Sequence, residues 1–132
     1  EVRARSRAAL AEGRHAARVS LLRALWSGAG TPGLSAGADD RAFYDLWPRV
    51  EAHIEAARPD FILLQCGADS LGGDPLANLD FTEKAHGHAA GRLRQLAERW
   101  CQGRLLALGG GGYNRANLAR AWCAVTEALA TP

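Results

Sequence analysis

The stretch RLLALGGGGYN, from Arg104 to Asn114, combines an apolar run, four consecutive glycines and a tyrosine. The run Arg104–Leu108 is short, continuous and apolar, which is typical of a buried strand in a parallel sheet. Glycine has no side chain, so a backbone made of it can adopt unusual dihedral angles and approach another group closely. A tight turn from strand to helix needs only one or two glycines, and four therefore indicate an additional role for this loop.

A second apolar run, Phe61–Cys66, precedes another loop that contains glycine, GADSLGGDPLANLD. Like the first run, it is typical of a strand that helices cover on both faces. Helical spacing of apolar residues, together with the capping residues Asp39–Asp40, Thr82 and Asn114, predicts three helices around these strands. Pro48 removes one backbone hydrogen bond and is expected to kink or split the first of them. The expected helices cover about 41–57, 83–100 and 115–130.

The order helix, strand, helix, strand, helix predicts an α/β fold with parallel strands and helices on both faces of the sheet. In such a sheet the carboxyl ends of the strands share one edge, and ligands collect there. The loops 67–78 and 109–113 both leave strands at this edge. We therefore expect these two loops to lie side by side.

The amino-terminal part of the chain does not belong to this pattern. Residues 1–26 predict a helix, since they contain no proline and a single glycine, and a loop rich in helix-breaking residues follows it up to Asp40. We divide the chain into an unplaced part, 1–38, and an α/β part, 39–132.

The composition is that of a globular protein, with 132 residues, 48% hydrophobic and 23% charged residues, and a net charge of +2. This length fits one domain with a modest core. The positive charges form no stripe, and no apolar run is long enough to span a membrane. Neither direct nucleic-acid binding nor membrane binding is therefore expected. Three cysteines without a CxxC pair argue against a disulfide framework and favour a cytoplasmic location.

A phosphate-binding loop is one interpretation of Gly109–Gly112, because glycine-rich loops before helices bind anions. The P-loop pattern requires Lys and then Ser or Thr after the last glycine, whereas Tyr113 and Asn114 stand there. The dinucleotide pattern GxGxxG also fails, since its third glycine position is occupied by Asn114. A nucleotide-binding module remains an alternative, as does a non-catalytic protein that uses the fold only for interactions.

Polar residues near the expected ligand edge have several possible roles. Asp69 follows the first strand in CGADS, and a carboxylate at the carboxyl end of a strand can be a turn former, a catalytic base or a metal ligand. Asp74 has stronger turn character, because Asp-Pro favours turns. His86 and His88 are two residues apart on an expected helix and should point to different faces, which argues against a shared metal site. Cys66, at the end of the strand, is expected to be a small core residue.

The segment FILLQCGADSLGGDPLANLDFT, followed by RLLALGGGGYNRANLARAW, resembles the carboxyl-terminal part of the zinc-dependent histone deacetylase family. The similarity is greatest to the class I type and to its bacterial relatives, the acetoin utilisation proteins, and it covers about 39–130. The resemblance implies the three-layer parallel-sheet fold of the arginase/deacetylase type. It also implies a hydrolase of acetyl-lysine, or of small acetylated amines in some bacterial members, with Zn²⁺ as its cofactor.

The resemblance further implies roles for individual residues. Asp69 corresponds to the last of three zinc ligands, Leu76 to an apolar residue beside the acyl-lysine tunnel, and Tyr113 to the tyrosine that binds the acetyl carbonyl oxygen. The backbone wall of this tunnel corresponds to Gly110, Gly111 and Gly112. Catalytic zinc keeps one position for a water, which it activates while it polarises the carbonyl. The hydroxyl of Tyr113 would then donate a hydrogen bond to the developing oxyanion.

Two motifs of the family do not occur in the sequence: the His-His pair that accepts the proton of the water, and the DxH pair of zinc ligands. One aspartate cannot hold a catalytic zinc. We therefore interpret the chain as a carboxyl-terminal fragment of a deacetylase, inactive alone and a weak zinc binder. Half a sheet would leave a bare edge and an uncovered apolar face, through which we expect self-association.

Overall fold

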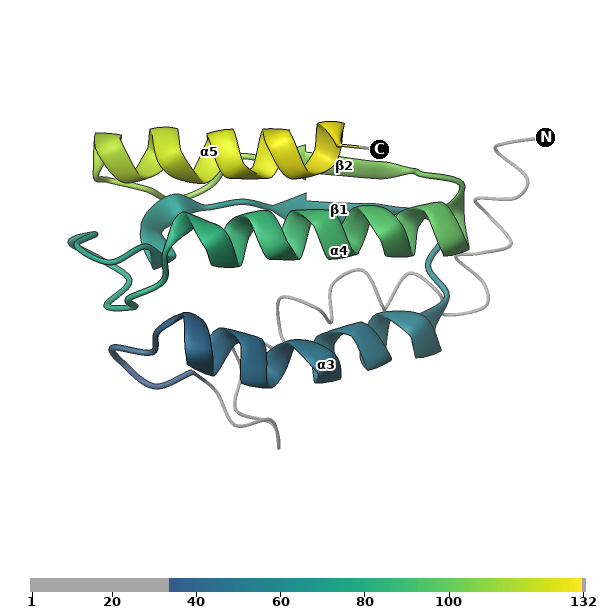
Figure 1. Ribbon diagram of the computed structural model, residues 1–132, viewed down its shortest axis with the longest axis horizontal. Coiled ribbons are helices and arrows are strands. Elements are labelled where there is room, and N and C mark those ends of the chain that lie inside the picture. The colour runs from purple at the N-terminus through teal and green to yellow at the C-terminus, as the bar shows by residue number, and fades with distance from the viewer. Residues whose placement is uncertain (1–33, 132) are drawn as a thin grey trace.

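The computed structural model describes residues 34–131 of the chain. Its elements follow the predicted order, with one short 3₁₀ turn after the first strand (Figure 1). They are α3 (Asp40–Ala57), β1 (Ile62–Gln65), η1 (Ala68–Ser70), α4 (Glu83–Cys101), β2 (Leu105–Leu108) and α5 (Arg115–Ala130). The helices and strands predicted after Asp39 are thereby confirmed. The helix expected over 1–26 lies outside the described residues.

Each helix begins at a capping side chain that the sequence predicts. The side chains of Asp39, Thr82 and Asn114 accept a backbone N–H from the first turn of α3, α4 and α5 at 3.1, 3.2 and 3.1 Å, respectively. The expected split at Pro48 does not occur, since α3 continues through it as one helix of 18 residues. Its neighbour Trp47 is buried, so packing on the core outweighs the one backbone hydrogen bond that proline removes.

The two strands pair in parallel, with Ile62 opposite Leu105 and Gln65 opposite Leu108. One further hydrogen bond, from Cys66 N–H to the carbonyl of Leu108 at 2.8 Å, extends the pairing to the carboxyl ends of both strands. The loops that follow β1 and β2 therefore start at the same edge of the sheet.

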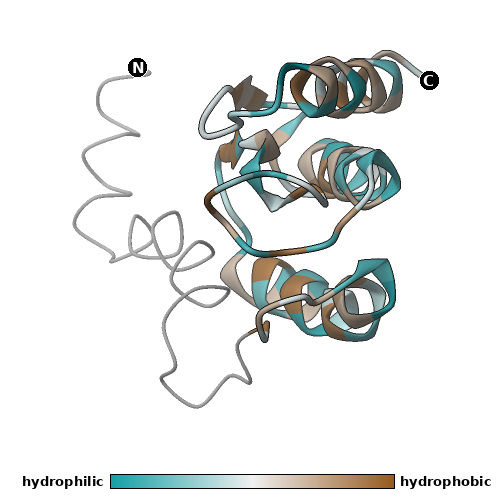
Figure 2. Cartoon of the chain, turned by 90° about the vertical axis from the view of Figure 1, so that its left-hand side faces the viewer, coloured by the Kyte–Doolittle hydropathy of each residue, from teal (hydrophilic) through white to brown (hydrophobic). Residues whose placement is uncertain are grey.

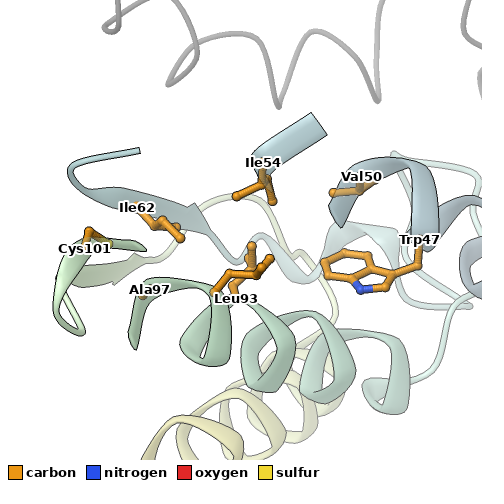
Figure 3. Packing of buried hydrophobic residues seen from close by; sticks show 8 residues of the cluster. Trp47, Val50, Ile54, Ile62, Leu93, Ala97 and Cys101 are labelled. Atoms are coloured by element: carbon orange, nitrogen blue, oxygen red, sulfur yellow. The ribbon is translucent and has the colours of Figure 1, made fainter. Parts of the chain in front are cut away.

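One face of the sheet packs against the helices. The main buried cluster joins α3, β1 and α4 (Figure 3). Its members are Trp47, Val50, Ile54, Ile62, Leu93, Leu96, Ala97 and Cys101. A second cluster attaches α5 to α4 and the sheet through Cys66, Ala90 and Val125. Cys66 is 3% exposed, which confirms the prediction that it is a small core residue.

The opposite face of the sheet is exposed in the described part of the chain. Leu63, Leu106 and Leu108 are 48%, 47% and 46% exposed, and Figure 2 shows the helices on one side of the strands. For residues 34–131, the prediction of helices on both faces is therefore wrong, and so is the prediction that Phe61–Cys66 is covered on both faces. Successive strand residues alternate between faces, and only the face that carries Ile62 is covered. Self-association through the bare face stays a prediction.

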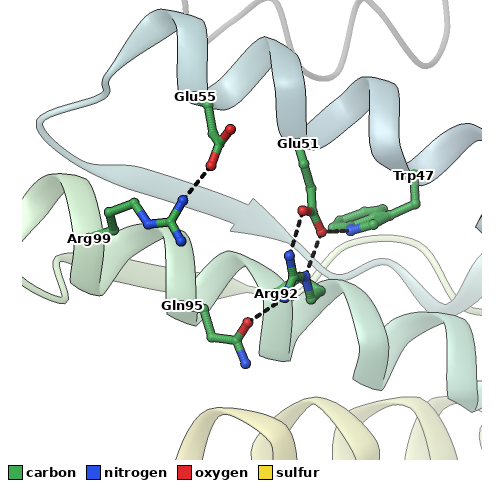
Figure 4. Close-up of polar contacts among 6 residues, drawn as sticks. All are labelled: Trp47, Glu51, Glu55, Arg92, Gln95 and Arg99. Atoms are coloured by element: carbon green, nitrogen blue, oxygen red, sulfur yellow. Dashed lines mark hydrogen bonds and ion pairs between the residues drawn. The ribbon is translucent and has the colours of Figure 1, made fainter.

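Charged side chains join α3 to α4 beside the main core (Figure 4). Arg92 donates from two nitrogens to the two carboxylate oxygens of Glu51, both at 2.6 Å. The indole nitrogen of Trp47 donates to the same carboxylate, and Arg99 pairs with Glu55 at 2.6 Å. A bidentate pair such as Glu51–Arg92 fixes the geometry of two helices better than a single contact does.

Substitution of Glu51 by Gln is expected to lower stability more at neutral pH than in acid. The hydrogen bond from Arg92 holds the pKa of the Glu51 carboxyl below its ordinary value of 4.5, although partial burial acts in the opposite direction. The pair therefore contributes stability above about pH 4.5 and loses it as the pH falls through the lower, folded-state pKa. Because the pair is partly exposed, we expect Glu51→Gln to reduce the free energy of unfolding by about 1 kcal/mol or less at pH 7.

Urea unfolding of the chain at pH 7 and near pH 3 measures this difference. Glu98→Gln is the control, since Glu98 pairs with Arg94 within α4 and joins no two elements. An equal loss of stability at both pH values in Glu51→Gln would show that the carboxylate charge is not responsible.

Candidate functional site

The loops after β1 and β2 lie side by side at the carboxyl edge of the sheet, as the sequence predicts. The N–H of Ala68 donates to the carbonyl of Gly111 at 2.6 Å. Ala68 is fully buried. This hydrogen bond joins η1 in the first loop to the glycine run in the second. We call the two loops together the rim.

Asp69 occupies the middle of η1, directly after Ala68, whose N–H is hydrogen-bonded to Gly111. Its carboxylate lies against Gly111, so closely that a β-carbon on that glycine would overlap the carboxyl group. A β-carbon on Gly67 would approach the same carboxylate to 2.8 Å. Two glycines therefore make room for one acidic side chain. This placement fits a metal ligand or a base better than a simple turn former, which needs no such space.

The glycine run packs closely against the first loop. A β-carbon on Gly110 would overlap the side chain of Gln65, and one on Gly112 would lie 3.0 Å from Ala68 Cβ. Gly112 also has φ of +135°, a backbone conformation that other residues rarely adopt. The missing side chains thus let the second loop lie against the segment that carries Asp69. A carboxylate beside Gly111 also disfavours a bound phosphate there, because the like charges repel.

Tyr113 and Leu76 both stand exposed on the rim. Their exposed fractions are 61% and 64%. The backbone N–H of Tyr113 donates to Asp74 Oδ2 at 2.8 Å, and the N–H of Leu76 donates to Asp74 Oδ1 at 3.0 Å. The rim therefore carries all six residues singled out by the resemblance. They are Asp69, Leu76, Gly110, Gly111, Gly112 and Tyr113.

The two helix histidines point to different neighbours, as predicted. His86 Nε2 lies 2.8 Å from Ser70 Oγ, in the residue after Asp69. Burial holds the pKa of His86 below its ordinary value, although the charges of Asp69 and Asp40 act in the opposite direction. His88 lies instead among the rings of α3, with its ring centroid 5.0 Å from that of Tyr44. His86 of α4 therefore contacts the last residue of η1, whereas His88 contacts the rings of α3.

Cys66 is not a nucleophile in this arrangement. Burial raises the pKa of its thiol to about 11, so the thiolate is scarce near neutral pH. Its Sγ lies 3.8 Å from the carbonyl oxygen of Leu64 within the core. The thiol thus serves packing.

Residues 34–131 do not complete a catalytic zinc site. They contain no group of three or more His, Cys, Asp or Glu side chains that could hold a metal ion. Catalytic zinc requires three protein ligands and one open position. Asp69 fits one such ligand, and no reaction step can be derived through a metal from the described residues. No helix among these residues has the length and apolar character needed to cross a lipid bilayer.

A comparison with protein families matches residues 31–129 to the family described as "Histone deacetylase domain". The chain belongs to the histone deacetylase family. Among curated relatives, "Histone deacetylase 6" of Arabidopsis thaliana is 40% identical over 91 residues, which are 68% of this chain and 18% of that protein. "Probable histone deacetylase 19" of Zea mays is 38% identical over 91 residues, with 68% of this chain and 17% of that protein covered.

Solved structures give the same result for the fold. The structure titled "Crystal Structure of HDA15 HD domain" has a TM-score of 0.65 and 28% identity, and the match covers 72% of this chain and 26% of that chain. The histone deacetylase Clr3 also reaches a TM-score of 0.65, at 24% identity, over 74% of this chain and 16% of that chain. The implied arginase/deacetylase-type fold and the family resemblance are confirmed. This deacetylase-family chain spans about a fifth of the length of the curated relatives that it matches.

Sequence analysis missed three side chains that support the rim. Ser70 and His86 pair across 16 positions. Asn117 is 1% exposed and donates from Nδ2 to the carbonyl of Gly72 at 3.0 Å. The only signal in the sequence was an asparagine in the first turn of α5, where it resembles a capping residue. Its long-range partner could not be read from local spacing.

Proposed function

We propose that this chain is the part of a zinc-dependent deacetylase that supplies one metal ligand, Asp69, and the carbonyl-binding phenol of Tyr113. The substrate is acetyl-lysine or a small acetylated amine, and the remaining metal ligands and the proton acceptor lie outside residues 34–131. Family membership supports this proposal. The observation that carries it is the contact between the carboxylate of Asp69 and Gly111. Gly111 stands two residues before Tyr113. The Asp69 carboxylate and the residue that carries the phenol, from distant loops, therefore belong to one edge of the sheet.

The role of Tyr113 follows from the chemistry of amide hydrolysis. Attack on the acetyl carbonyl turns its oxygen into an oxyanion, and a donor that is fixed beforehand stabilises that charge. The N–H of Tyr113 is held by Asp74, whereas its side chain is free of the core and 61% exposed. The phenol is therefore available to donate a hydrogen bond to a substrate oxygen. The glycines before it let an extended, uncharged acetyl-lysine pass along the backbone without meeting a side chain.

A graft tests the proposal. The segment of Arabidopsis thaliana Histone deacetylase 6 that matches this chain would be replaced by the matching 91 residues of this chain. We call this hybrid the graft. We expect it to hydrolyse an acetyl-lysine peptide, to lose that activity on zinc chelation, and to recover it when zinc is restored. Asp69 and Tyr113 would then stand in a protein that has the remaining ligands.

The isolated 132-residue chain is the control for the graft. We expect it to show no deacetylase activity and only weak zinc binding by calorimetry, because a single carboxylate is a poor zinc site. A graft that folds and binds zinc but hydrolyses neither an acetyl-lysine peptide nor acetylated small amines would refute the proposal. Zinc-dependent hydrolysis by the isolated chain would refute the division of ligands on which it depends.

A further inference from the structure

The segment Leu71–Leu76 of the first loop forms hydrogen bonds with the second loop and with α5. At its start, Leu71 is 1% exposed and lies in the core. Asn117 of α5 donates from Nδ2 to the carbonyl of Gly72 at 3.0 Å, and its own side-chain oxygen accepts from Arg120 at 2.5 Å. The start of the segment is therefore fixed by the burial of Leu71 and by a partly buried hydrogen bond.

The end of the segment is fixed by one carboxylate. Asp74 Oδ1 accepts the N–H of Leu76 at 3.0 Å, and Asp74 Oδ2 accepts the N–H of Tyr113 at 2.8 Å. Leu76 and Tyr113 are themselves mostly exposed, at 64% and 61%. Packing against the core thus does little to hold either side chain. Within the part of the chain that the structure describes, the Asp74 carboxylate connects the backbones of Leu76 and Tyr113 directly.

A turn former would need only one of these two hydrogen bonds. The bond from Asp74 to Leu76 closes a local turn over two positions, which the Asp-Pro sequence predicts. The bond to Tyr113 crosses 39 positions to another element and adds nothing to the turn. The pKa of Asp74 is raised by desolvation, but the backbone N–H groups of Tyr113 and Leu76 lower it below its ordinary value. The carboxylate is therefore ionised at neutral pH, and both hydrogen bonds are charge-assisted.

We propose that Asp74 is a positioning residue, whose carboxylate sets the spacing between Leu76 and Tyr113 across the rim. The inference rests on the proposed function where it identifies that spacing as the width of the acyl-lysine tunnel. The spacing determines whether the phenol of Tyr113 meets the carbonyl of a substrate that lies beside Leu76. A displacement of about 1 Å at such a position can cost about 100-fold in rate.

Asp74→Asn in the full chain tests the positions of both residues. Asparagine has the shape of aspartate but only one acceptor oxygen, so its NH₂ group must face one of the two backbone N–H groups. We expect the amide of Tyr113, of Leu76 or of both to exchange hydrogen about 10-fold faster or more, while amides in α4 and α5 keep their rates. Residue-resolved hydrogen exchange by NMR measures this. Asp80→Asn is the matched control, because Asp80 is an exposed aspartate of the same loop whose carboxylate takes part in neither bond.

Equal exchange rates at Tyr113 and Leu76 in the Asp74→Asn and Asp80→Asn variants would overturn the proposal. Faster exchange throughout α4 and α5 would overturn it too, because it would mean that Asp74 stabilises the whole fold and not only the rim.

In the graft, Asp74→Asn is expected to lower kcat about 10- to 100-fold, with the zinc content of the graft unchanged. Local exchange changes without a change in kcat would contradict the positioning role. If the graft with the native Asp74 folds and binds zinc but is inactive, the proposed function fails, and the exchange rates still decide whether Asp74 holds the two residues.

Discussion

Tyr113→Phe in the graft is expected to lower kcat by about 10²–10³-fold, with KM and zinc content nearly unchanged. The substitution removes one hydroxyl and keeps the ring, so the shape of the rim is preserved. A hydrogen bond to an oxyanion strengthens as charge develops on the carbonyl oxygen. Its loss therefore raises the barrier without weakening the binding of the neutral amide. Steady-state kinetics with an acetyl-lysine peptide, together with metal analysis, separate these quantities.

Tyr44→Phe is the matched control for this measurement. Tyr44 lies on α3, where its ring contacts Phe43 and His88 at centroid distances of 5.4 and 5.0 Å, and neither of these residues belongs to the rim. The same removal of a hydroxyl at this position should leave kcat unchanged. A Tyr113→Phe graft that is as active as the Tyr44→Phe graft would show that the phenol stabilises no transition state. A rise in KM at constant kcat would indicate that Tyr113 only binds substrate.

The secondary structure could be predicted closely because its signals are local. Asp39, Thr82 and Asn114 cap the three helices, and glycine- or proline-containing breaks separate the elements. The position of the rim could also be predicted, since parallel strands place the loops after them at one edge. Both signals place Asp69 and the glycine run at the same edge of the sheet.

The covering of the sheet could not be predicted from the same signals. A short apolar run looks alike whether helices cover one face or two. Leu63 and Leu64 are adjacent in β1, yet Leu63 is 48% exposed, whereas Leu64 packs against the buried clusters. Both residues are leucines, so residue type does not reveal which of the two faces is exposed. Which face is bare depends on where the helices lie, and that depends on contacts between distant segments.

The polar contacts of the rim were beyond sequence reasoning for the same reason. Asp74 could be recognised as a turn residue, but its bond to Tyr113 spans 39 positions. Thr82 could be recognised as a cap, but its hydroxyl also donates to Asp40 at 2.5 Å, across 42 positions. Local patterns reveal the first role of such residues. The second role depends on the packing of α5 and α3 around the first loop.

Gly111→Ala is expected to abolish zinc binding and activity in the graft, and to destabilise the full chain by about 1–3 kcal/mol. The added methyl group would occupy the space of the Asp69 carboxylate. The glycine loop cannot easily move away, because the carbonyl of Gly111 accepts from Ala68 and the N–H of Tyr113 is held by Asp74. Asp69 must therefore turn aside. Metal content, kcat and the free energy of unfolding measure the three consequences.

Gly109→Ala separates this effect from a general intolerance of the glycine run. A β-carbon on Gly109 would meet only a ring carbon of Trp122, at 3.4 Å, which is a van der Waals contact that a small ring shift relieves. Neither Gly109 nor Gly111 has a positive φ, so backbone strain does not distinguish the two substitutions, whereas Gly112 does and is unsuitable. We expect the Gly109→Ala graft to keep its zinc and most of its activity. If both variants lose zinc alike, the contact between Gly111 and Asp69 is not the cause. If both keep it, Asp69 does not need the space that the glycine leaves.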